Sequence, residues 1–139
     1  MYLVDTNIWL ERLLDQERSA EVGEFLAQTP TDRLLMSDFT LHSIGVILAR
    51  LERRGVLLPF VDDVFVEGGV RLVTVQPEAM HLVVAVMERF GLDFDDAYQY
   101  VAAEQADAVI VSFDGDFDRT DHGRQTPAEV LREGDAAKS

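Results

Sequence analysis

The chain has 139 residues, no cysteine and a formal net charge of −14. Its hydrophobic content of 47% and charged content of 27% are typical of a globular domain and exclude an intrinsically disordered chain. The lack of cysteine excludes disulfides, zinc–thiolate sites and cysteine nucleophiles. No apolar run approaches the roughly 20 residues that cross a bilayer, and the first residues lack the basic segment of a signal peptide. We therefore expect a cytoplasmic protein with no membrane partner.

The first half of the chain alternates short apolar runs with amphipathic segments. Residues 2–4 are expected to form a buried strand that ends at Asp5, and residues 33–37 a second strand. We predict helices over residues 7–14, over residues 19–28 with Ser19 as N-cap, over residues 38–54 with Gly55 as the stop, and over residues 58–67 with Pro59 in the first turn.

The second half of the chain repeats this alternation. Valine-rich runs predict strands over residues 70–76 and 108–112. The helices are expected to run from Pro77 to a stop at Gly91, over residues 93–105, and from a cap at Thr126, with Pro127 in the first turn, to about residue 133.

Strands that are apolar throughout and separated by helices indicate a parallel sheet with both faces covered. We predict an α/β fold with three layers, α/β/α, around a short, mainly parallel central sheet of four to five strands. No repeat, low-complexity tract or linker divides the sequence. One domain over residues 1–132 is therefore expected, followed by a frayed tail over residues 133–139.

Aspartates follow two of the predicted strands, at the edge where such sheets bind ligands. Asp5 comes directly after the first strand, and Asp114 and Asp116 follow the last one in the segment VIVSFDGDFDR. If these strands are neighbours, the acids converge with Asp96, near the start of the helix before the last strand. Carboxylates held close together share a proton or bind a hard cation, and Mg²⁺ or Mn²⁺ is the natural occupant.

Ordinary structural roles compete with metal binding for some of the acids. Acidic side chains at a helix N-terminus are common caps, which favours that role for Asp93 and Asp95. Asp118 and Asp121 are expected to be solvated loop charges. Asp5 has little structural reason to end an apolar strand. The pattern by itself therefore leaves a metal site and a set of caps and turns as open alternatives.

Two segments, YLVDTNIWL near the start and DDAYQYVAAEQADAVIVSFDGDFDR near the end, resemble PIN-domain ribonucleases in sequence, order and separation. The nearest likeness is to the VapC-type toxins of bacterial and archaeal toxin–antitoxin pairs, over residues 1–132. The resemblance implies a PIN-like fold whose metal ligands and catalytic acids are Asp5, Asp96, Asp114 and Asp116. Beside these acids it places Thr6, Asn7, Ser43 and Ser112.

Ser43 marks a departure from the family's pattern. The family usually has a glutamate on the helix after the second strand, in the pattern S-x-x-T-x-x-E, whereas here Ser37 and Thr40 are followed by Ser43. The serine removes one negative charge from the expected site. Asp38 lies about 140° away around the helix and should point elsewhere. His42 is adjacent, although a lone histidine is more often a surface or packing residue.

The resemblance implies an endoribonuclease that hydrolyses RNA phosphodiesters with Mg²⁺ or Mn²⁺. It also implies a cognate antitoxin that blocks the site, and a homodimer. The apolar stretches 41–51 and 57–66 are candidates for either contact or for ordinary core, and a basic antitoxin would suit the negative charge.

Two alternatives to the nuclease differ in class. One is a PIN-fold binding or regulatory module whose catalysis is weakened by Ser43. The other is a phosphoryl-transfer enzyme with an aspartate nucleophile. The second is the less consistent, because it requires a lysine near the acids and the only lysine is Lys138.

Overall fold

The computed structural model describes residues 1–138. In this part of the chain a single parallel sheet has the strand order β3-β2-β1-β4. The strands are β1 (Tyr2–Val4), β2 (Leu34–Ser37), β3 (Arg71–Val73) and β4 (Val109–Val111). The central strand β1 therefore pairs with both β2 and β4, and its Leu3 lies opposite Leu35 and Ile110. The predicted α/β class and the short parallel sheet are confirmed.

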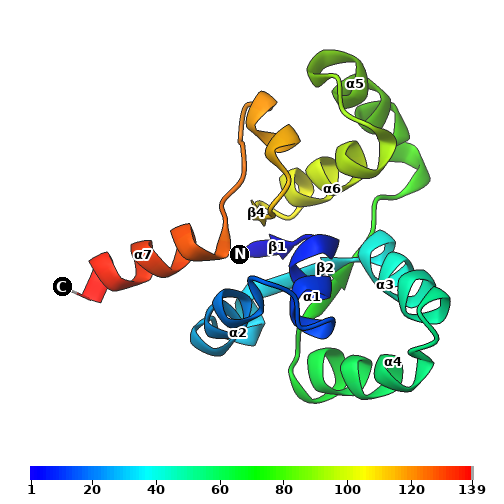
Figure 1. Cartoon of the computed structure of the whole chain (residues 1–139). Helices are drawn as coiled ribbons and strands as arrows, with labels where there is room; N and C mark the ends of the chain where they lie inside the picture. The colour runs from blue at the N-terminus through cyan, green and yellow to red at the C-terminus, as the bar shows by residue number, and fades with distance from the viewer. Residues whose placement is uncertain (139) are drawn as a thin grey trace.

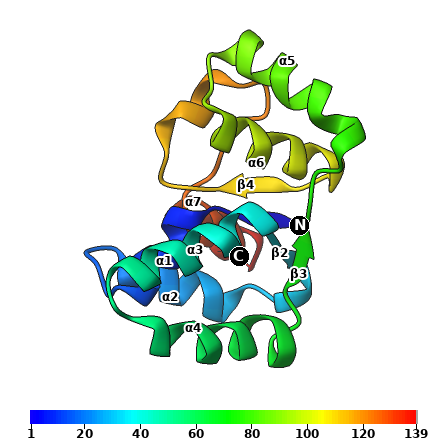
Figure 2. The same cartoon turned by 90° about the vertical axis from the view of Figure 1, so that its right-hand side faces the viewer.

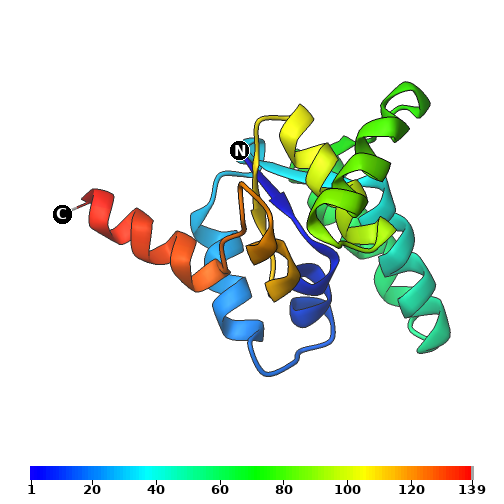
Figure 3. The same ribbon diagram turned by 90° about the horizontal axis from the view of Figure 1, so that it is seen from above.

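Helices cover both faces of the sheet (Figure 2). One face carries α5 (Met80–Phe90) and α6 (Phe94–Gln105). The other face carries α1 (Thr6–Leu13), α2 (Ser19–Gln28), α3 (Asp38–Arg50) and α4 (Arg54–Val61). The last helix, α7 (Pro127–Lys138), packs against α2 and extends away from the body of the molecule (Figures 1 and 3).

The strands divide their side chains between two hydrophobic cores. Leu3 and Ile110 belong to the core under α5 and α6, whereas Val4 and Val111 belong to the core on the opposite face. Successive side chains of a strand point to opposite faces, and here both faces are buried. This explains why each strand is an uninterrupted apolar run in the sequence.

Three helices end at a left-handed residue that is not glycine, namely Asp15, Glu52 and Asp107. After α3, the Glu52 N–H donates to the Ala49 carbonyl at 3.1 Å and the Arg53 N–H donates to the Leu48 carbonyl at 2.7 Å. This pair of bonds defines a Schellman motif. The helix ends there, and the prediction that it runs to Gly55 was wrong, because Gly55 lies inside α4.

The region after α3 differs from the prediction in two further ways. α4 begins at Arg54, so Pro59 lies in its interior rather than in its first turn. Proline lacks the N–H that the ladder of hydrogen bonds requires, and the following segment, Asp62–Glu67, is π-helical. The strand expected over residues 70–76 is confined to Arg71–Val73.

The ends of α2 and α7 agree only in part with the prediction. Ser19, the expected N-cap of α2, is instead its first residue. Thr126 caps α7 as predicted, because it exchanges hydrogen bonds of 3.2 Å with Glu129 in a capping box. The segment expected to be a frayed tail continues α7 to Lys138, and Ser139 lies outside the described residues. Within residues 1–138, every helix is too short or too polar to span a bilayer.

Candidate metal centre

Aspartates from separate segments meet at one edge of the sheet. β1 and β4 are paired along their whole length, so their carboxyl ends lie side by side. Asp5 follows β1 and caps α1, where its carboxylate accepts the Thr6 N–H at 2.8 Å. Asp114 follows β4 and caps a short 3-10 turn, Gly115–Arg119, in which it accepts the Asp116 N–H at 2.9 Å. β1 and β4 are therefore neighbours in the sheet, as expected.

Three carboxylates form the candidate centre. Asp96, Asp114 and Asp116 each offer an oxygen within 4.8 Å of the other two. Asp96 lies in the first turn of α6, and the same turn contains Asp95, which is exposed. Asp96 and Asp114 are half-buried, and Asp116 is exposed. We call these three residues the aspartate triplet. Asp5 is only 6% exposed and lies outside the triplet.

The carboxyl group of Asp96 has a high proton affinity. Its pKa is raised from an ordinary 3.8 to about 7, first by burial and then by the charges of Asp114 and Asp5. A hydrogen bond with Asp114 and the charge of Asp116 act in the same direction. Ionisation of Asp96 beside the other acids is therefore unfavourable unless a cation compensates the charge, which favours binding of a cation.

Hydrogen bonds hold Asp5 from both sides. Its Oδ1 accepts the Gln99 amide at 2.9 Å in addition to the Thr6 N–H, and its Oδ2 accepts the Ser112 hydroxyl at 2.7 Å. Burial raises the pKa of Asp5 and the charge of Asp114 adds to this, whereas the three hydrogen bonds act in the opposite direction.

Asn7 and Ser112 connect α1 to the loop after β4. The Asn7 amide donates to Ser112 Oγ at 3.2 Å, and its carbonyl accepts the Phe113 N–H at 3.2 Å. Ser112 Oγ also accepts the Asp114 N–H at 2.9 Å while it donates to Asp5. The serine hydroxyl is thus fully used, and it links the backbone of the Asp114 loop to the Asp5 carboxylate.

Gln99, which is 1% exposed, was not among the residues expected at the site. Its amide nitrogen donates to Asp5 Oδ1 and, at 2.7 Å, to Thr40 Oγ1, which in turn shares a hydrogen bond of 2.9 Å with Thr6 Oγ1. The carbonyl Oε1 of Gln99 has no partner within residues 1–138. A polar residue on the buried face of α6, one turn after Asp96, is the signal that could have revealed it.

The PIN-domain family model matches residues 2–123 of the sequence. The chain belongs to the PIN-domain family. The sequence resemblance to PIN domains is therefore confirmed, and the shared segments include all four aspartates. No curated protein matches the chain significantly.

Solved structures share the fold of this PIN domain. VapC20 of Mycobacterium tuberculosis, a toxin that cleaves the sarcin–ricin loop, has a TM-score of 0.72 and 19% identity, over 85% of this chain and 93% of that chain. FitAcB of Neisseria gonorrhoeae has a TM-score of 0.72 and 21% identity, over 92% and 99% of the two chains. A toxin–antitoxin complex from Klebsiella pneumoniae has a TM-score of 0.72 and 19% identity, over 91% and 98%. The expected VapC-like fold is confirmed.

Ser43 adds no carboxylate to the centre of this PIN domain. It lies one turn after Thr40 on α3, is half-buried, and makes no side-chain hydrogen bond within residues 1–138. Asp38 does not replace it, because its two oxygens accept the Tyr98 hydroxyl at 2.7 Å and the Thr74 hydroxyl at 2.8 Å. His42 is exposed and is not grouped with the triplet.

Other charged residues near this edge are paired on the surface. Asp118 lies 3.2 Å from Arg124 and Asp121 lies 3.0 Å from Arg89, and both acids are more than half exposed. Their expected role as solvated loop charges agrees with these contacts. Asp93 occupies the N-cap position of α6 but makes no capping hydrogen bond with its side chain.

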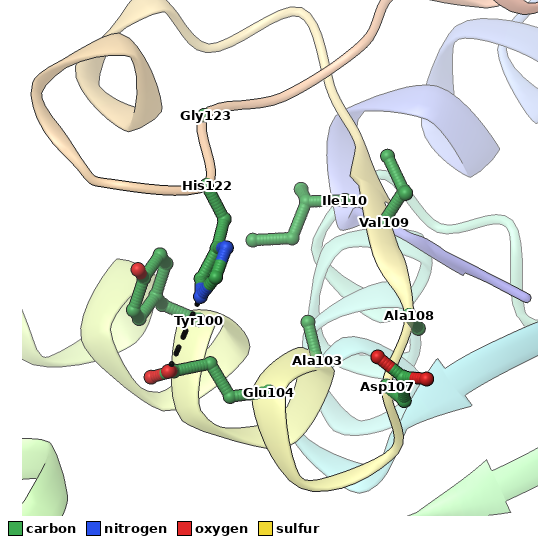
Figure 4. A pocket seen from close by; sticks show the side chains of 9 residues that line it. All are labelled: Tyr100, Ala103, Glu104, Asp107, Ala108, Val109, Ile110, His122 and Gly123. Carbon is green, nitrogen blue, oxygen red and sulfur yellow. Dashed lines mark ion pairs between the residues drawn. The ribbon is translucent and has the colours of Figure 1, made fainter.

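A separate pocket lies between α6, β4 and the loop that contains His122 and Gly123 (Figure 4). It has a volume of about 240 Å³ and contains none of the four aspartates. His122 stacks on Tyr100, with ring centroids 5.8 Å apart, and its ring lies 3.5 Å from the Glu104 carboxylate. These contacts account for His122 without a metal ion.

Proposed function

We propose that this PIN domain is an Mg²⁺- or Mn²⁺-dependent endoribonuclease that acts as the toxin of a toxin–antitoxin pair. The aspartate triplet carries the proposal, because three carboxylates crowd together at the edge of the sheet, where burial and the neighbouring acids raise the pKa of Asp96 to about 7. A donor set of oxygen atoms alone suits a hard divalent cation. The described activity of VapC20 and the toxin–antitoxin complexes among the similar structures support the RNA substrate and the biological role.

The triplet supplies the ligands in this proposal, and Asp5 is the fourth carboxylate of the site. When bound, the metal ion supplies Lewis-acid activation of water and neutralises charge on the phosphate. Asp116 is exposed and suited to orient a water molecule by accepting a hydrogen bond from it. Arg119, 3.4 Å from Asp116, holds this carboxylate at the surface.

The test compares Asp96→Asn with Asp95→Asn, an exposed aspartate in the same turn of α6. We expect Asp96→Asn to abolish most Mn²⁺ binding and to slow cleavage of a mixed RNA pool by more than about 100-fold. Loss of a residue that only orients a metal ligand typically reduces affinity or activity by about 10- to 100-fold, and loss of the ligand itself should reduce them further. Asp95→Asn should behave like the wild type. Calorimetry with Mn²⁺ and gel analysis of the RNA give both values. Full cleavage by Asp96→Asn would contradict the proposal.

A second candidate function is a binding or regulatory module with weakened catalysis. The observation that favours it is Ser43, which offers a neutral hydroxyl where the family pattern has a carboxylate. The same experiment separates the two functions. Mn²⁺ binding by the wild type without cleavage of any RNA pool would support the module, whereas cleavage that depends on Asp96 supports the nuclease.

A cognate antitoxin is the proposed protein partner, and its basic side chains would complement the net charge of −14. Of the two apolar stretches, residues 41–51 place Ile44 and Leu48 in the core. Residues 57–66 border a groove of about 440 Å³ between α1, α2 and α4. We propose this groove as the antitoxin or homodimer contact, and light scattering of the purified chain tests the dimer.

A further inference from the structure

Gln99 is a polar side chain on an otherwise apolar, buried face of α6. It follows Asp96 by three residues, so both side chains lie on the same side of the helix. An aliphatic side chain could fill this space without leaving a polar atom unpaired, whereas Gln99 Oε1 lacks a partner within residues 1–138. The reason for an amide at this position must therefore lie in the contacts of its nitrogen.

The amide nitrogen of Gln99 provides that explanation. Both of its protons are used, one toward Asp5 Oδ1 at 2.9 Å and one toward Thr40 Oγ1 at 2.7 Å. Thr40 is itself fixed, because its N–H donates to Ser37 Oγ at 3.1 Å at the start of α3. A single buried amide thus connects α6, α3 and the end of β1.

The two oxygens of Asp5 have different surroundings. Oδ1 accepts two N–H groups, from Gln99 and Thr6. Oδ2 accepts only the Ser112 hydroxyl, and Ser112 Oγ also receives the Asp114 N–H. Oδ2 is therefore the oxygen on the side of the Asp114 loop, and it retains room for another partner. Rotation about the Cβ–Cγ bond of an aspartate is otherwise loosely restricted.

We propose that Gln99 is a positioning residue, whose amide fixes Oδ1 of Asp5 and so presents Oδ2 toward the aspartate triplet. This inference rests on the proposed metal site and names a residue that orients one of its carboxylates. Gln99 acts through Asp5, because the atom that contacts the carboxylate is its amide nitrogen, a donor that does not bind a cation. The unpaired Oε1 is the consequence of orienting the amide with its nitrogen toward Asp5.

The test compares Gln99→Met with Gln105→Met, an exposed glutamine at the end of the same helix. In metal-free protein, the ¹³C signal of the Asp5 carboxyl should titrate at a higher pH in Gln99→Met than in the wild type, because the carboxylate loses a donor. The dissociation constant for Mn²⁺ should rise about tenfold. Gln105→Met should change neither value. An unchanged Asp5 titration, or unchanged Mn²⁺ affinity, overturns the proposal.

Thr40→Val provides a second variant if Gln99→Met fails to fold. Valine preserves the shape of threonine but removes the acceptor that anchors the other amide proton of Gln99. We expect a smaller change of the same sign in both measurements, and no change in either would overturn the proposal. Absence of Mn²⁺ binding by the wild type would instead contradict the proposed metal site, while the Asp5 titration would still report whether Gln99 holds Asp5.

Discussion

Asp96 links the protonation of the candidate centre to the stability of the fold. Its pKa is 3.8 ordinarily and about 7 in the folded chain. Between these two pH values the folded protein binds more protons at Asp96 than the unfolded chain does, so stability falls as the pH rises through this window. The raised pKa of Asp5 acts with the same sign. A metal ion requires the ionised carboxylate, so its affinity should rise over the same window.

We therefore predict that metal-free protein unfolds at a higher temperature at pH 5 than at pH 7.5, as far as Asp96 contributes. Asp96→Asn should stabilise the protein at pH 7.5 by on the order of 1 kcal/mol, a value reduced because solvent screens this half-buried group. Thermal unfolding of the wild type, Asp96→Asn and Asp95→Asn at the two pH values provides the measurement. An equal change of unfolding temperature with pH in the wild type and in Asp96→Asn would contradict the raised pKa of Asp96.

At the scale of the elements, the ends of α1, α3 and α6 depend on left-handed residues that have side chains. Glu52 adopts a φ of 58°, which glycine reaches without the clash of a Cβ atom. Gly55, in contrast, lies in the first turn of α4, and a Cβ added there meets no atom within 4 Å. Local sequence rules point to the glycine as the helix stop, but the Schellman hydrogen bonds place the stop at Glu52.

Two substitutions test this placement. Glu52→Gly should stabilise the fold by about 0.5–1 kcal/mol, because it relieves the left-handed strain. Gly55→Ala should also stabilise it, by up to about 1 kcal/mol, since alanine is the better helix former. Chemical denaturation of both variants gives the values. If Gly55 were the helix stop, Gly55→Ala would destabilise the protein instead.

At the scale of the whole molecule, the buried residues of α7 lie in its first half. Val130 is buried in the core on the α2 side, and Leu131 packs against it. Residues 132–137 are exposed and the helix extends away from the body (Figure 3). The proposed domain boundary at residue 132 therefore lies directly after the buried turn of α7 and before its exposed residues.

A chain that ends after Arg132 should keep its fold and its Mn²⁺ affinity. Its free energy of unfolding should change by less than about 1 kcal/mol, as for other exposed surface changes. A chain that ends after Thr126 loses the burial of Val130 and should be destabilised by about 2 kcal/mol or more. Circular dichroism during heating compares the two truncations with the full chain. A large loss from the shorter deletion would contradict the boundary.

The sequence alone was sufficient for the architecture and for the edge of the sheet at which the candidate site lies. Apolar runs separated by helices are a local property, and they predict a parallel sheet because both faces of each strand must be covered. An aspartate directly after such a strand lies at the carboxyl edge by chain connectivity alone. Asp5 and Asp114 could therefore be placed at one edge before any contact was known.

Only the tertiary structure decided which of these side chains form the triplet and which of them hold Asp5 by hydrogen bonds. Gln99 and Asp5 are 94 residues apart in the chain, and Gln99 and Thr40 are 59 apart. No local pattern encodes such contacts, because they arise when α6 and the start of α3 come together at the carboxyl end of β1. The same packing draws Asp96 to Asp114 and Asp116 and leaves Asp5 buried outside the triplet. The residue types followed from the sequence, whereas their hydrogen bonds and proton affinities follow from burial and proximity.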